Sequence, residues 1–171
     1  RTSLGEAVGS AVAAIVTIYA SVIVTVIVMA GLTGASPQTM AEPARQIYGM
    51  FGRPTWGMIL GIAGSAAVFE EIVFRGFLLP RLRVLSGSWA VSVVIGSALF
   101  AAPHIWEGPW AVALILPVAV VLSVTFVMTR SLAAPMLTHF LFNFLQLAMI
   151  RGLQNLPEWQ EILQPAQGVG T

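Results

Sequence analysis

Residues 61–80 read GIAGSAAVFEEIVFRGFLLP, an apolar run interrupted by three charged residues, Glu70, Glu71 and Arg75. A run of about 20 mainly apolar residues is long enough to cross a bilayer as a helix. Charged side chains inside such a helix are costly, so they are usually paired or functional. This stretch therefore predicts a membrane helix that carries a polar site within the bilayer.

Charge is scarce along the whole chain. The 171 residues include eight Arg and seven Glu but no Lys, Asp or Cys, and the net charge is +1. Only 9% of the residues are charged, against roughly 25% in a soluble domain. This composition excludes a disordered chain, a disulfide framework and a thiolate metal site. No nucleic-acid partner is expected, because the sequence has no basic patch larger than Arg81 and Arg83; the expected partner is the lipid bilayer.

Long apolar segments predict an all-α polytopic bundle of about five transmembrane helices, plus a short interfacial helix. The spans are predicted at about 8–32, 56–79, 89–102, 110–128 and 132–150, the second ending at Pro80. The interfacial helix is predicted to begin at Ser36-Pro37, with apolar residues at helical spacing as far as Phe51. Residues 156–163 show a weaker pattern of the same kind. We treat 1–171 as one membrane domain with a motif-bearing core at 56–150; its first residue is Arg1 rather than Met, which leaves room for upstream residues.

Tryptophan, glycine and arginine refine this arrangement. Four tryptophans lie at predicted span ends, as in an aromatic belt: Trp56, Trp89, Trp106 and Trp110. Three glycines form a ridge that predicts close helix packing: Gly57, Gly61 and Gly64. The cytoplasmic face is predicted to carry Arg1, Arg81, Arg83 and Arg130, and the opposite face Arg45, Arg53 and Arg151. We therefore expect a multi-pass protein of the cell inner (plasma) membrane.

The polar residues within the predicted spans form a candidate site. Glu71 and Arg75 are four positions apart and can pair on one helix face. Glu70 is rotated by about 100° from Glu71 and lacks that partner, so it carries the strongest functional prediction. Three further groups lie at similar depth on two other helices: His104, His139 and Asn143. Each of these groups also has a simpler, structural interpretation. Glu71 and Arg75 can form an ion pair, and His104 can cap a helix. His139 and Asn143 can form interhelical hydrogen bonds, and Glu107 can belong to a loop with membrane anchors.

Three short motifs resemble those of the CPBP family (CAAX protease and bacteriocin-processing, also called Abi), which are glutamate-type intramembrane endopeptidases. Residues 70–75, EEIVFR, match EExxxR. Residues 100–104, FAAPH, match FxxxH, and residues 139–143, HFLFN, match HxxxN. The motifs occur in the family's order on apolar helices, over residues 70–143.

The resemblance implies an endopeptidase that hydrolyses a peptide bond of a membrane-associated protein or peptide without a cofactor. It implies that Glu70 and His104 act as general base and water-positioning partner. His139 and Asn143 would form an oxyanion hole. Glu71 would be auxiliary and Arg75 would orient the carboxylates. Arg without Lys suits a bacterial chain, for which leader peptides or sorting signals are better substrate candidates than prenylated proteins.

Two other functions remain open from the residues alone. The first is a metal-dependent membrane protease, in which zinc is held by Glu70, His104 and His139 and activates water. The usual HExxH pattern of such enzymes is absent. The second is a non-catalytic membrane scaffold or bacteriocin-immunity protein, which would tolerate changes at Glu70 and His104 that preserve packing.

Overall fold

The computed structural model describes residues 3–157 and 159, and every regular element in this part of the chain is helical. Five helical stretches are long and apolar enough to cross a membrane, which confirms an all-α, multi-pass membrane protein. These stretches are Leu4–Thr33, Trp56–Ser86, Trp89–Glu107, Pro109–Thr129 and Ala133–Leu153.

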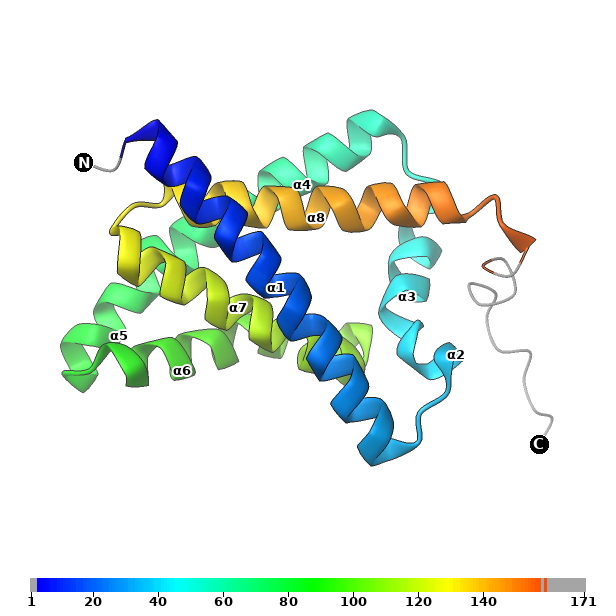
Figure 1. The fold of residues 1–171 in the computed structure, drawn as a ribbon, viewed down its shortest axis with the longest axis horizontal. Coiled ribbons are helices and arrows are strands. Elements are labelled where there is room, and N and C mark those ends of the chain that lie inside the picture. Colours follow the sequence, from blue (N-terminus) through cyan, green and yellow to red (C-terminus); the bar gives the residue numbers. More distant parts are fainter. Residues whose placement is uncertain (1–2, 158, 160–171) are drawn as a thin grey trace.

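The bundle is built by two helix pairs that α1 crosses. Helix α4 (Trp56–Glu71) packs against α8 (Ala133–Leu153), and α6 (Trp89–Ala101) packs against α7 (Pro109–Thr129). Helix α1 (Leu4–Thr33) runs diagonally over α7 and α8 (Figure 1). Their shared core contains Ile18, Val118 and Leu122. Most other apolar side chains of α1 point outward, as expected for a helix in contact with lipid.

The second span continues beyond its predicted end. Helix α4 ends at Glu71, a π-helical segment follows at Ile72–Leu78, and α5 covers Leu79–Ser86. The N–H of Leu79 bonds to the carbonyl of Phe74, five residues back. Pro80 is the second residue of α5, directly after the π-helical segment, and the chain stays helical through it as far as Ser86. The prediction that Pro80 ends this helix was therefore wrong.

The predicted interfacial helix is split into two. Helix α2 covers Pro37–Met40, begins at the predicted Ser36-Pro37 step, and is capped by the Ser36 hydroxyl, which accepts from the Thr39 N–H. Helix α3 covers Glu42–Phe51, with a proline in its first turn, which explains why the chain restarts there. Residues 158 and 160–171 lie outside the described residues, and with them most of the predicted 156–163 pattern.

Two packing predictions need correction. A Cβ built at the three ridge glycines meets no side chain of another helix within 4 Å. Helix α4 instead buries its neighbouring face, which carries Ile59, Ala63 and Ala67. Trp110 is only 8% exposed and is therefore a core residue rather than a membrane anchor, whereas Trp56 and Trp106 are more than half exposed.

The two ends of the bundle carry different arginines. The α5–α6 and α7–α8 connections lie at one end, and α3 lies at the other (Figure 1). The first end therefore holds Arg81, Arg83 and Arg130, as the sequence predicts. At this end the guanidinium carbons of Arg83 and Arg130 lie 5.8 and 4.5 Å from the ring centroid of Trp89.

Candidate active site

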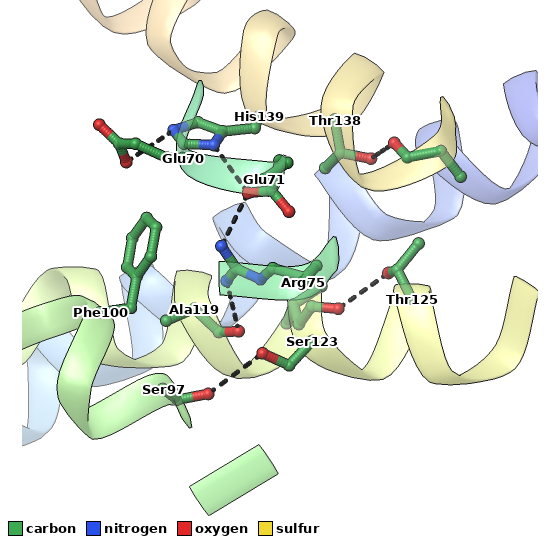
Figure 2. Close-up of polar contacts among 12 residues, drawn as sticks. Glu70, Glu71, Arg75, Ser97, Phe100, Ala119, Ser123, Thr125, Thr138 and His139 are labelled. Atoms are coloured by element: carbon green, nitrogen blue, oxygen red, sulfur yellow. Dashed lines mark hydrogen bonds and ion pairs between the residues drawn. The ribbon is translucent and has the colours of Figure 1, made fainter. Parts of the chain in front are cut away.

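A buried ion pair forms the base of the site. Nη1 of Arg75 lies 2.7 Å from Oε1 of Glu71, and the two side chains are 1% and 0% exposed. Nη2 of Arg75 donates to the carbonyl of Ala119 on α7 at 3.0 Å (Figure 2). The predicted Glu71–Arg75 pair is confirmed, and the hydrogen bond to Ala119 ties it to a second helix.

His139 lies between the two glutamates. Its Nδ1 donates to Oε1 of Glu71 at 2.9 Å, and its Nε2 lies 3.9 Å from Oε2 of Glu70 (Figure 2). His139 is almost fully buried, whereas the side chain of Glu70 is 37% exposed. The adjacent glutamates thus differ in position: Glu71 belongs to the buried network, and Glu70 is open to an approaching molecule.

Phe100 connects the histidines and the arginine. Its ring centroid lies 4.4 Å from the guanidinium carbon of Arg75 and 5.9 Å from the His139 ring. The His104 ring stacks on it at 5.8 Å, and Nδ1 of His104 donates to the Phe100 carbonyl at 3.2 Å. Phe100 was expected only as the first residue of the FxxxH motif, with no contact of its own. The sequence signal for its contact with His104 was the spacing of four, which places an aromatic ring one helical turn before a histidine.

His104 has a close acidic neighbour that sequence reasoning missed. Nε2 of His104 lies 4.0 Å from Oε1 of Glu107, and both residues belong to the 3₁₀ helix Ala102–Glu107. Glu107 is 9% exposed. The interpretation of Glu107 as part of a loop was therefore wrong, because the chain stays helical past Ala101 and buries this side chain.

The six predicted residues are brought together to different degrees. Glu70, Glu71, Arg75 and His139 are linked by polar contacts, and His104 joins them through Phe100. Asn143 is half-buried one turn beyond His139 on α8. Within the described part of the chain, Asn143 has no hydrogen bond to the other five. Its position is set by the helix, which keeps residues four apart on one face.

A metal centre is the alternative use of these donor groups. Among residues 3–157 and 159, no group of three or more His, Cys, Asp or Glu side chains is placed to hold an ion. In the alternative set of Glu70, His104 and His139, Nδ1 of His139 donates to Glu71, so Nε2 is the nitrogen of that ring that could face an ion.

Comparison with known families agrees with the motifs. A family model described as type II CAAX prenyl endopeptidase Rce1-like matches residues 52–145, more than half of the chain. The chain belongs to this family. All six predicted site residues of this Rce1-like protein fall inside the matched range, and the family is one of CAAX-type intramembrane proteases. No curated protein and no solved structure matches the chain.

Proposed function

We propose that this Rce1-like protein is an intramembrane endopeptidase that hydrolyses a peptide bond of a membrane-associated protein or peptide. The observation that carries the proposal is the position of Glu70, a 37% exposed carboxylate beside the buried His139–Glu71–Arg75 network. The nearest partner of this carboxylate is Nε2 of His139 at 3.9 Å, and an accessible carboxylate within a membrane helix is costly, so a chemical role explains it best.

Water activation is assigned to Glu70 and His104. Glu70 takes a proton from the attacking water as general base, and His104 positions that water against it. General base catalysis of this kind contributes about 10²- to 10⁴-fold in rate. The 25% exposure of the His104 side chain supports this role, because a water-binding group has to be reachable.

Oxyanion stabilisation is assigned to His139 and Asn143. The bond from Nδ1 of His139 to Glu71 holds the ring and leaves Nε2 facing the Glu70 side of the site. Because Nδ1 already carries the hydrogen of that bond, Nε2 donates only when the ring carries both hydrogens, and this imidazolium form is the one assigned to the oxyanion role. The Asn143 amide, one turn along the same helix, supplies a second N–H donor. Two donors held by rigid elements can stabilise the negative charge that develops on the carbonyl oxygen. Arg75 keeps Glu71 in place and so orients His139.

The proposed reaction needs no cofactor. The carboxylates and histidines provide the base and the hydrogen-bond donors, and the chain supplies no thiol or Asp nucleophile. We propose that the protein lies in the inner membrane of a bacterium, with the Arg81–Arg83 end in the cytoplasm. Leader peptides, sorting signals and other membrane-proximal segments are the proposed substrates.

Cleavage-site mapping tests this function. Membranes that contain the wild type, Glu70→Ala or the control Phe69→Leu are compared by mass spectrometry of newly formed peptide termini. Phe69 is 69% exposed on the same helix turn, so its variant should behave like the wild type. A precursor that accumulates only with Glu70→Ala identifies the substrate. Identical termini in all three samples would favour the scaffold function instead.

A further inference from the structure

Glu107 is the carboxylate that the proposed reaction leaves without a role. It lies outside the three motifs, and its side chain is only 11% exposed at the end of a membrane helix. Burying a charged carboxylate in such a place is costly unless a partner compensates. The nearest partner is His104, which the proposed function places at the reacting water.

The local geometry directs Glu107 toward His104. A 3₁₀ helix has three residues per turn, so side chains three positions apart lie directly above one another. His104 and Glu107 have this spacing in the 3₁₀ helix Ala102–Glu107, and their Nε2 and Oε1 atoms lie 4.0 Å apart. Gly108 follows with φ of 100°, a conformation that favours glycine, and ends the helix directly after Glu107.

The hydrogen-bonding partners of His104 then indicate that it shares a proton with Glu107. The Phe100 carbonyl can only accept, so Nδ1 of His104 carries a hydrogen. A carboxylate also only accepts, so Nε2 and the Glu107 carboxylate face each other favourably only with a proton between them. The pair therefore holds one proton, on Nε2 or on the carboxyl group.

We propose that His104 and Glu107 act as one proton-sharing pair that protonates the leaving amine. This inference rests on the proposed endopeptidase function. Water gives its hydroxide to the scissile carbonyl carbon and its proton to Glu70. The C–N bond then breaks, its electron pair stays on nitrogen, and that nitrogen takes the proton of the pair. The proton on Glu70 passes back to the pair, so the enzyme returns to its starting state.

The other charged groups near the pair are consistent with Glu70 as the base and the His104–Glu107 pair as the acid. Glu70 belongs to α4, and Arg75 and His139 both contact the Phe100 ring on which His104 stacks. From α3, Glu42 packs its Cγ 3.6 Å from the position of a Cβ on Gly108, but its carboxylate pairs with Arg45 on its own helix. Glu107 is thus the carboxylate that shares a helix face with His104, and Glu42 offers a matched control.

The test compares two leaving groups. The substrate is the peptide that spans the cleavage site mapped above, made once with the native amide and once with a thioester at the scissile bond. A thiolate leaves without being protonated, whereas an amine does not. Rates are measured for the wild type, Glu107→Gln, Glu107→Asp and Glu42→Gln in detergent, and each variant is checked for folding by thermal unfolding.

We expect Glu107→Gln to lower kcat for the amide by about 10²-fold, with little change in KM or in thioester hydrolysis. Glu107→Asp should recover part of the loss, and Glu42→Gln should match the wild type. An equal loss on both substrates, or an undiminished amide rate, would overturn the inference while the proposed function stands. A wild type that cleaves neither substrate would contradict the proposed function itself, and the inference with it.

Discussion

His139 and Glu71, which are 68 positions apart in the chain, are joined by a 2.9 Å hydrogen bond from Nδ1 to Oε1. The same oxygen accepts from Arg75 at 2.7 Å. One carboxylate oxygen thus connects the second and the fifth membrane helix, and through Arg75 the fourth. Because Glu71 is occupied in this way, the neighbouring Glu70 is the carboxylate left to meet a substrate.

Replacing Glu70 by glutamine should abolish activity and leave the fold intact. The amide cannot take a proton from water, so we expect a loss of about 10²- to 10⁴-fold for the amide and the thioester substrates alike. The side chain is 37% exposed, so the unfolding temperature in detergent should stay near the wild-type value. Full activity in Glu70→Gln would remove Glu70 from the mechanism.

Glu71→Gln should act mainly on stability. The change leaves Arg75 as a buried charge without its counterion, and breaking a buried pair from one side costs about 3–5 kcal/mol. Thermal unfolding in detergent measures this loss. Replacing both residues, as Glu71→Leu with Arg75→Met, should be less damaging than Glu71→Gln alone, because no uncompensated charge remains.

The control for this prediction is Glu42→Gln. Glu42 pairs with Arg45 at 3.4 Å, but its side chain is 38% exposed. An exposed ion pair contributes about 0–1 kcal/mol, so little change is expected. Similar destabilisation by Glu42→Gln and Glu71→Gln would mean that burial of the Glu71–Arg75 pair has no special weight.

Phe100→Leu should impair catalysis more than stability. The substitution keeps an apolar core residue but removes the ring that Arg75, His104 and His139 contact. Small displacements of catalytic groups can lower kcat by about 10²-fold, while one core substitution of this kind costs about 1–3 kcal/mol. Phe69→Leu, the same change at an outward-facing site, should keep wild-type kinetics. Equal rates in both variants would contradict the positioning role of Phe100.

Cleavage should survive removal of metal ions. The proposed mechanism uses side chains alone, so a preparation treated with a chelator should retain the wild-type rate, and added zinc should not raise it. The measurement is peptide cleavage before and after treatment, with metal content checked in parallel. Loss of activity on chelation and its recovery with zinc would favour the metal-dependent alternative.

Membrane orientation can be read with single cysteines, because the chain contains none of its own. Leu85 is 83% exposed at the end of α5, and Met50 is 52% exposed on α3 at the opposite end. A membrane-impermeant maleimide should label Met50→Cys in intact spheroplasts, but Leu85→Cys only after permeabilisation. The reverse pattern would place Arg81 and Arg83 outside.

Sequence patterns predicted the features that are determined within a single helix. Length and hydropathy are enough to locate five spans, and a spacing of four is enough to pair Glu71 with Arg75. The bond between His139 and Glu71 was beyond reach, because periodicity places a residue on one face of its own helix and says nothing of how two helices are rotated against each other.

Unusual local winding explains the remaining differences. The prediction at Pro80 assumed an unbroken α-helix, in which a proline clashes with the carbonyl four residues back. The interpretation of Glu107 assumed that the third span ended near Pro103. In both places the chain changes to another helix type, and no single residue there indicates the change. Single-residue preferences therefore misplaced the end of the second span and the direction of the Glu107 carboxylate.

The π-helical segment also determines how α5 is rotated about the helix axis relative to α4, although both belong to one span. An α-helix turns by about 100° per residue, so removing one residue from 76–78 without a change of winding would rotate the following residues by about that angle. Leu79, which is 1% exposed and packs close to Gly96, would then leave its contact with α6. The number of residues in the π-helical segment thus sets the rotation of the α5 face that contacts α6 relative to the carboxylates on α4. Among relatives, an insertion or deletion at residues 76–78, beyond Arg75, would rotate α5 relative to α4 without altering any motif residue.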